Sequence, residues 1–333
     1  MPSIAMNIMD VMPQPIRCVM TVHGSTAVAR RLAQSCAMTT LNALRRSALY
    51  APGANPAVLL KAARSEADVL IFDLEDAVAP QSKSMAREAV VRALADPAVA
   101  ARTVVVRVNA IGSVWCEDDV RTVASLRPAG ILFPKINTPA DVKLAQAMLS
   151  FYGVPRSTAL WCMIETPQAI LNAQAMGQLA LDSDARMSTW VLGTNDLVKE
   201  LHARHTPMRE GLMPMLAIAL MAARANGLCV LDGVHNDIQD TAGFAATCKQ
   251  GRQMGFDGRT LIHPTQIEAC HAAYSPTEQE VEDARAVVAA FDLPENQGKG
   301  VLKVGGRMVE LLHAQIARQT LTMDEAIAKA RRS

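Results

Sequence analysis

The chain alternates between short apolar runs and longer stretches in which apolar residues recur at helical spacing. The short runs are almost continuously hydrophobic, which is typical of strands buried on both faces of a parallel sheet. From residue 46 onward we predict eight strands: Ser47–Tyr50, Asp68–Asp73, Thr103–Asn109, Gly130–Ile136, Ala159–Glu165, Thr189–Gly193, Leu228–Gly233 and Thr260–His263.

The predicted helices between these strands carry recognisable start and stop signals. A capping residue followed by proline at the first helical position marks several starts. This device occurs at Asn55-Pro56, Thr138-Pro139, Thr166-Pro167 and Ser275-Pro276. Gly227 and Gly255 lie where two helices are predicted to end.

Eight strands, most followed by a helix, predict an α/β fold with a (β/α)₈ TIM barrel over residues 45–292. An open doubly wound sheet is the alternative, because the first and last strands are short. Beyond the barrel, Asn296–Gly300 is a Gly-rich linker and Val309–Arg332 is predicted to be helical. We assign residues 293–333 to a linker and a C-terminal lid helix. The same pattern also fits a helix packed on its own barrel.

Residues 1–44 are rich in methionine and contain one acidic residue, Asp10. We expect this extension to be disordered or to precede the true start, for which Met38 is the candidate. Arg17, Arg30 and Arg31 also fit an organellar transit peptide, which is Arg-rich and poor in acids. The extension is left out of the predicted fold.

Composition narrows the classes of function. The 33 basic and 32 acidic residues nearly cancel, which argues against a nucleic-acid partner. The longest uncharged apolar run, Gly211–Ala223, is too short to cross about 30 Å of hydrocarbon, so no membrane span is expected. None of the seven cysteines forms a Cys-x-x-Cys pair, which fits a reducing, cytoplasmic location.

Polar residues gather where the predicted strands end, and in such a barrel these carboxyl ends line the active site. The strand ends carry Asp73, Glu75, Asp76, Arg107, Asn109, Lys135, Glu165, Asp196, Asp232 and His263. Carboxylates at this density repel each other unless a cation lies among them, and an oxygen-rich site suits Mg²⁺. Glu165 and Asp196 end adjacent strands and are the natural ligand pair. Arg107 offers a planar fork for a substrate carboxylate.

At these residues the sequence resembles the citrate lyase beta-subunit-like family of the HpcH/HpaI aldolase superfamily, which includes malyl-CoA and citramalyl-CoA lyases. The resemblance runs in order over roughly residues 45 to 320. The matching segments are Arg46–Gly53, Asp73–Val78, Val106–Asn109, Pro134-Lys135, Ile164–Thr166, Gly193–Leu197, Gly255–Gly258 and Ile262–Ile267.

The resemblance implies roles for individual residues. Glu165 and Asp196 match magnesium ligands, and Arg107 matches the residue that grips the substrate carboxylate. The other matched positions bind or organise the substrate or its CoA portion: Tyr50, Lys61, Glu75 and Asp76. Lys135 is expected to act electrostatically, because no Schiff base is needed.

The family's C-terminal lid brings a catalytic acid, usually Asp, to a neighbouring subunit. In the segment Gly305–Glu310 the corresponding residue is Glu310, and the proline that usually follows is replaced by Leu312. The extra methylene of glutamate moves the carboxyl by about a bond length, enough to affect a catalytic group. A lid acting on a neighbour requires a homo-oligomer, expected to be a trimer or hexamer.

The reaction implied is a retro-Claisen cleavage of a 3-hydroxyacyl-CoA, with Mg²⁺ as cofactor, Arg107 on the substrate carboxylate and Glu310 protonating the acetyl-CoA enolate. The product is acetyl-CoA with glyoxylate or pyruvate, and the sequence leaves that choice open. Three other functions remain open as well: a metal-dependent pyruvate aldolase without CoA, a citrate lyase subunit acting on a carrier-bound acyl chain, and a non-catalytic acyl-CoA binder.

Overall fold

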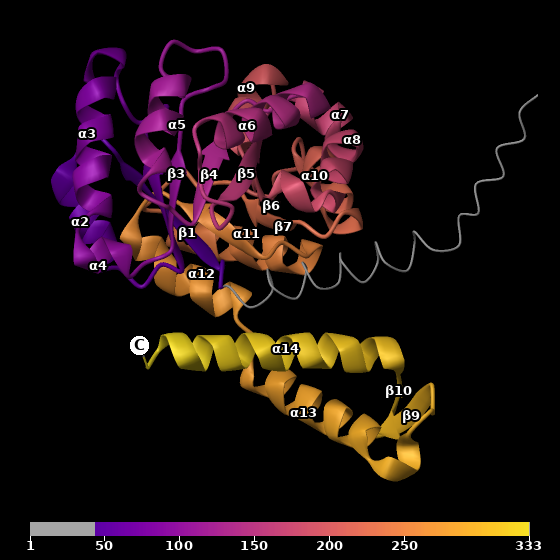
Figure 1. Cartoon of the computed structure of the whole chain (residues 1–333). Helices are drawn as coiled ribbons and strands as arrows, with labels where there is room; N and C mark the ends of the chain where they lie inside the picture. Colours follow the sequence, from indigo (N-terminus) through magenta and orange to yellow (C-terminus); the bar gives the residue numbers. More distant parts are fainter. Residues whose placement is uncertain (1–43, 333) are drawn as a thin grey trace, which may run out of the picture.

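The computed structural model describes residues 44–332, so the expectations for residues 1–43 lie outside the described residues. Eight parallel strands form a closed barrel in sequence order, with β1 pairing both β2 and β8 (Figure 1). The predicted (β/α)₈ barrel is confirmed and the open sheet is excluded. The barrel strands are β1 Ser47–Pro52, β2 Val69–Asp73, β3 Val104–Arg107, β4 Gly130–Phe133, β5 Ala159–Ile164, β6 Met187–Leu192, β7 Cys229–Asp232 and β8 Gly258–Leu261.

Helices surround this barrel, and most of them connect one strand to the next. Their bounds are α2 Pro56–Ala63, α3 Lys83–Leu94, α4 Pro97–Ala100, α5 Cys116–Ala124, α6 Pro139–Phe151, α7 Pro167–Leu171, α8 Ala173–Gln178, α9 Thr194–Glu200, α10 Met213–Ala225, α11 Thr241–Met254 and α12 Ile267–Tyr274. The inward side chains of the strands, among them Ile71, Trp161 and Leu231, form an inner core. A larger core lies between the strands and the helices. The described cysteines are buried and unpaired.

The capping signals in the sequence were correct at three helices and wrong at one. Asn55, Thr138 and Thr166 each accept a hydrogen bond from a backbone N–H in the first turn of their helix. At the start of α13 (Glu278–Asp292), however, Thr277 is the cap, and Ser275-Pro276 lies outside the helix. Since Ser275 has extended backbone geometry and its hydroxyl accepts from Arg46 Nη1 at 2.9 Å, it belongs to the connection between α12 and α13.

The segment after α12 folds into a unit of its own, residues 278–332, which we name the arm. It consists of α13, the antiparallel hairpin β9 (Val301–Val304) and β10 (Arg307–Glu310), and α14 (Leu311–Ala330). Phe291, Leu302, Val309 and Ala314 form its small core. The predicted helix over Val309–Arg332 is therefore wrong at its start, because Val309 and Glu310 belong to β10. Gly305 and Gly306 both have positive φ and make the two-residue turn.

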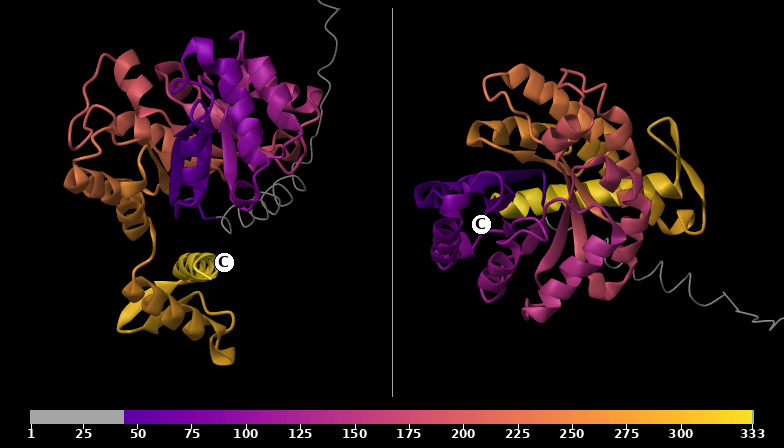
Figure 2. Two further views of the ribbon diagram at one scale, coloured as in Figure 1. Left: turned by 90° about the vertical axis from the view of Figure 1, so that its left-hand side faces the viewer. Right: turned by 90° about the horizontal axis from the view of Figure 1, so that it is seen from above.

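The arm lies beside the end of the barrel that carries α12. In Figure 1, α9, which directly follows β6, lies at the top of the view, whereas α13, the hairpin and α14 lie below the barrel. Figure 2 shows the same arrangement from the side. The arm is thus at the opposite end from the carboxyl ends of the strands. Among residues 44–332, no helix is long and apolar enough to cross a membrane.

Candidate active site

A pocket of about 380 Å³ opens at the carboxyl ends of the strands. Its lining includes six of the side chains discussed below: Tyr50, Asp73, Asp76, Arg107, Glu165 and Asp196. They come from β1, the end of β2 and the turn after it, β3, the residue after β5 and the first turn of α9. The parallel strands bring these side chains together, although they are far apart in the sequence. The predicted pairing of Glu165 and Asp196 with Arg107 in one pocket is therefore present.

Glu165 and Asp196 share one cationic neighbour, Lys135. The Lys135 Nζ lies 2.6 Å from Asp196 Oδ1 and 3.5 Å from Glu165 Oε1. The backbone N–H of Lys135 also donates to Glu165 Oε1 at 2.7 Å. Burial by itself lowers the pKa of Lys135, but Glu165 and Asp196 outweigh burial and raise it above its usual range. The ammonium is therefore charged and lies between two carboxylates.

Glu165 is the most constrained member of this group. Its side chain is 1 % exposed, and its buried Oε2 atom has no hydrogen-bond partner among residues 44–332. Burial raises the pKa of Glu165 above its usual range and nearby Asp196 adds to the shift, while Lys135 opposes it. Gly193 leaves room for this carboxylate, because a Cβ on Gly193 would lie 2.5 Å from Oε2. A glycine is therefore required at position 193, because the Glu165 side chain approaches its backbone closely.

These residues fit a divalent cation that keeps part of its shell as water or substrate oxygen. A buried carboxylate oxygen without a partner is costly, and a cation beside it would relieve that cost. Within the described residues, no group of three or more acidic, histidine or cysteine side chains converges on one point. Two carboxylates without a third protein ligand suit Mg²⁺, which usually binds one or two carboxylates together with waters and substrate oxygens.

Arg107 is held by carboxylates on both sides. Asp73 binds it through two bonds, Nε to Oδ1 at 2.7 Å and Nη2 to Oδ2 at 2.6 Å. On the other side, Nη1 lies 2.8 Å from Glu75 Oε2 and 3.8 Å from Asp76 Oδ2. Sequence reasoning gave the Arg107 fork to the substrate, but the structure gives its Nε edge to Asp73. The edge formed by Nη1 and Nη2 remains, and Glu75 contacts it at Nη1.

Glu75 and Tyr50 add two polar groups beside this arginine. Burial raises the pKa of Glu75 to about 8, although Arg107 pulls it in the opposite direction. The Tyr50 hydroxyl is buried without a hydrogen-bond partner, and the Arg107 guanidinium lies 5.0 Å from its ring centroid. The Tyr50 hydroxyl therefore holds hydrogen-bonding capacity that no other described residue uses, whereas Glu75 already contacts Arg107. The substrate-side roles that the family resemblance implies for both residues remain predictions.

The turn that carries Glu75 is fixed by a buried lysine that sequence reasoning missed. Lys83 Nζ donates to the carbonyl oxygens of Leu74 and Glu75 and to Asn109 Oδ1, at 2.7 to 2.8 Å. A lysine at the start of a predicted helix gives no sign of this role, because most such lysines are exposed. Asn109, predicted at the pocket mouth, is instead buried in this support and also donates to Asp119.

Two other strand-end residues do not reach the pocket. Asp232 is fully buried on the outer side of the barrel, where Arg209 Nη1 donates to both of its oxygens at 2.7 to 2.8 Å. His263 caps the short turn that follows it by accepting from the Thr265 N–H. Side chains alternate across a strand, so a polar residue near a strand end points into the pocket in only one of two registers.

Lys61 and Glu310 are also not brought to this pocket within one chain. Lys61 is exposed in the last turn of α2. Glu310 ends β10 in the arm, and its backbone N–H donates to His313 Nδ1 at 2.9 Å. Both roles, implied by resemblance alone, remain predictions.

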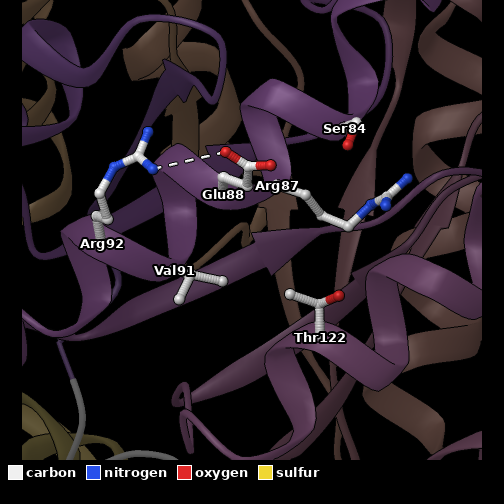
Figure 3. A pocket seen from close by; sticks show the side chains of 6 residues that line it. All are labelled: Ser84, Arg87, Glu88, Val91, Arg92 and Thr122. Carbon is white, nitrogen blue, oxygen red and sulfur yellow. Dashed lines mark ion pairs between the residues drawn. The ribbon is translucent and has the colours of Figure 1, made fainter.

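A second hollow, of about 460 Å³, lies between α3 and α5 (Figure 3). Its arginines are already paired, Arg87 with Asp119 at 2.8 Å and Arg92 with Glu88 at 3.7 Å. It holds no strand-end residue of the barrel mouth. The chemistry therefore belongs to the first pocket.

The chain is similar in sequence to known enzymes along most of its length. The sequence profile of the HpcH/HpaI aldolase/citrate lyase family matches residues 46–264. A (3S)-malyl-CoA thioesterase from Cereibacter sphaeroides is 43 % identical over 288 residues, which are 86 % of this chain and 97 % of that protein. A citrate lyase subunit beta from Escherichia coli is 35 % identical over 271 residues, which are 80 % of this chain and 88 % of that one.

Solved structures of similar proteins share the fold. The protein CitE from Mycobacterium tuberculosis, in complex with magnesium, acetoacetate and coenzyme A, is 29 % identical with a TM-score of 0.67. That match covers 84 % of this chain and 98 % of the other. A citrate lyase beta subunit from the same organism, complexed with oxaloacetate and magnesium, has a TM-score of 0.60 at 29 % identity, and the match covers 71 % of this chain and 99 % of the other.

Proposed function

The chain belongs to the HpcH/HpaI aldolase/citrate lyase family, and on that basis we propose that it is a Mg²⁺-dependent carbon–carbon lyase acting on a 3-hydroxyacyl-CoA. The substrate class is a thioester that carries a hydroxyl and a carboxylate, of the malyl-CoA or citramalyl-CoA type. Its products are acetyl-CoA and a 2-oxo acid, glyoxylate or pyruvate. One observation carries the proposal: Glu165 and Asp196 line the same pocket as Arg107.

In this proposal Glu165 and Asp196 hold the magnesium ion. When bound, Mg²⁺ would supply Lewis-acid polarisation of the substrate hydroxyl and carboxylate oxygens. The solved relatives that contain magnesium with acetoacetate and coenzyme A, or with oxaloacetate, support the choice of ion and of ligand class. The buried, unpartnered Oε2 of Glu165 supports it from this chain's own residues.

Arg107 binds the substrate carboxylate through its Nη1 and Nη2 edge. Asp73 fixes the orientation of the guanidinium from the opposite edge, so little side-chain motion remains to be lost on binding. Glu75 occupies part of the free edge, and its raised pKa favours the protonated form, which does not compete with an incoming carboxylate. The Tyr50 hydroxyl would donate to a substrate oxygen, and its burial without a partner among the described residues supports this role.

Cleavage needs a proton at the carbon that leaves as acetyl-CoA. The substrate hydroxyl loses its proton to solvent as its oxygen becomes the carbonyl oxygen of the 2-oxo acid, and the electron pair of the breaking carbon–carbon bond passes to the thioester enolate. The enolate carbon then takes a proton from the Glu310 carboxyl. Because the arm lies at the other end of its own barrel, Glu310 acts on a neighbouring copy in a homo-oligomer. The exposed apolar side chains around it support this, since Met308 is 68 % exposed, Leu311 54 % and Ile316 55 %.

The test is a cleavage assay with malyl-CoA and citramalyl-CoA. With Mg²⁺ present, the full-length protein should release glyoxylate or pyruvate together with acetyl-CoA, and EDTA should stop the release. Unchanged turnover in EDTA would remove the metal from the reaction. Failure to cleave either thioester, in a folded protein, would overturn the assignment.

Thioester hydrolysis is a second candidate. It is favoured by the 43 % identity to proteins named (3S)-malyl-CoA thioesterase. Hydrolysis of malyl-CoA gives free CoA and malate, whereas the lyase gives acetyl-CoA and glyoxylate. A thiol reagent added at the start of the assay separates them, because only hydrolysis releases a free thiol directly.

A further inference from the structure

We propose that Lys135 is an internal cation that a divalent metal must displace from between Glu165 and Asp196, so that this residue sets the affinity and charge selectivity of the site. The inference rests on the magnesium site of the proposed function. It concerns a different property of that site, namely what opposes metal binding.

The Lys135 ammonium lies where a shared cation would neutralise both carboxylates. Its Nζ is 2.6 Å from Asp196 Oδ1 and 3.5 Å from Glu165 Oε1. A metal ion bound by the same two carboxylates would lie next to this ammonium. Two neighbouring positive charges repel each other strongly in a half-buried pocket. The metal and the ammonium therefore exclude each other from this position.

The backbone of Lys135 allows its side chain to leave without dismantling the site. Its N–H donates to Glu165 Oε1 at 2.7 Å, so the main chain continues to position Glu165 after the ammonium has moved. The side chain is 31 % exposed, which gives the ammonium a path to water. Lys135 also has φ of 54°, an uncommon value for a residue with a side chain, and this places its N–H and its Nζ on the same carboxylate.

The charge balance gives the expected selectivity. With Lys135 in place, two carboxylates face one positive charge. A monovalent ion that replaced the ammonium would leave the net charge at the two carboxylates unchanged. Its binding would therefore yield no electrostatic gain to offset the free energy needed to displace the Lys135 side chain. A divalent ion neutralises both carboxylates by itself and releases the ammonium. The freed ammonium remains at the mouth of the pocket, where it adds positive charge beside an anionic substrate.

The experiment is a direct measurement of metal binding in the full-length protein. Mn²⁺ is titrated by electron paramagnetic resonance, and Mg²⁺ by calorimetry, into the wild type, Lys135→Gln and Lys135→Asn. Asparagine tolerates positive φ, so the second variant guards against misfolding of the first. Both variants should bind the metal about tenfold more tightly than the wild type, because no ammonium has to be displaced.

Lys199→Gln is the matched control. Lys199 lies on α9, three residues after Asp196, and is exposed. Its substitution therefore removes the same charge without removing a contact to Glu165 or Asp196. Its metal affinity should equal that of the wild type. Thermal melts provide a second measurement. Without metal, the Lys135 variants should have a lower melting temperature than the wild type, and added Mg²⁺ should raise their melting temperature by more.

The outcomes separate the two proposals. Equal or weaker metal binding by both Lys135 variants, with normal binding by the wild type, would overturn the role of Lys135 and leave the magnesium site in place. No metal binding by the wild type and by either variant would overturn both. An equal increase in metal affinity in Lys199→Gln would mean that the effect comes from the net charge of the protein, and this would also overturn the inference.

Discussion

The pocket and the arm differ in how far their charged and apolar side chains are covered. In the pocket, Arg107 and Glu165 are buried, and each side chain contacts at least one opposite charge. In the arm, Glu310 is exposed, and the apolar side chains near it, among them Met308 and Leu312, are exposed as well. The first region is fixed within one chain. The second carries polar and apolar groups that one chain leaves uncovered.

This difference explains how the proposed chemistry is divided. Carboxylates that hold a cation must be kept close together against their own repulsion, which requires a rigid scaffold such as a barrel mouth. A proton donor is needed only at the moment of bond cleavage, and it can arrive on an element that closes over the substrate. The predictions below test whether the two regions form one site.

The largest effect is expected for Glu165→Gln. The change keeps the shape of the side chain but removes a ligand charge, so kcat/KM should fall by about a thousandfold or more. Mg²⁺ should no longer raise the melting temperature. Glu268→Gln, an exposed residue on α12, makes the same change of charge and should have no effect. Retained Mg²⁺ stabilisation in Glu165→Gln would show that the metal binds elsewhere.

Glu310→Gln should lower kcat by about 10²- to 10⁴-fold with little change in KM or melting temperature, because the residue is exposed and acts as a proton donor. Mixing this variant with Glu165→Gln should restore activity. In a mixed oligomer, an intact pocket from one chain meets an intact arm from another. If the mixture stays inactive although the subunits exchange, the arm does not act on a neighbour.

Arg107→Lys should have a smaller effect, a loss of about 10- to 100-fold in kcat/KM, mostly through KM. Lysine keeps the positive charge but cannot bind Asp73 and a substrate carboxylate at the same time from two edges. Product inhibition by the 2-oxo acid should weaken in parallel. An unchanged KM would place the substrate carboxylate elsewhere in the pocket.

The next prediction concerns stability without metal rather than catalysis. Glu75 has a pKa raised from 4.5 to about 8, so the folded protein binds this proton more tightly than the unfolded chain. Stability should therefore fall as pH rises from about 4.5 to about 8, by on the order of a few kcal/mol. Denaturant melts across this range measure it, and Glu75→Gln should flatten the curve. A rise in wild-type stability with pH would contradict the assigned burial.

Added Mg²⁺ should stabilise the protein more at high pH than at low pH. Burial raises the pKa of Glu165, so at low pH a proton must leave before a cation binds. Thermal melts with and without Mg²⁺ at several pH values measure the difference. A constant Mg²⁺ effect across the range would mean that Glu165 is already ionised without metal.

Local patterns in the sequence were sufficient for the barrel. Every predicted strand is present, because continuous apolar runs have few other stable uses in an α/β chain. Thr138 and Thr166 cap their helices as predicted, because capping depends on a few neighbouring residues. The hairpin of the arm was missed although Gly305-Gly306 between two apolar runs is a turn signal.

The sequence by itself determined the order of strands and helices and, to within a few residues, where each strand ends, since these depend on residues close together in the chain. Only the tertiary structure decided that Asp73 occupies one edge of Arg107, that Asp232 faces away from the pocket, and that Lys135 lies between Glu165 and Asp196. Each of those contacts joins residues more than twenty positions apart. Their geometry depends on side-chain direction and barrel closure, which no local pattern encodes.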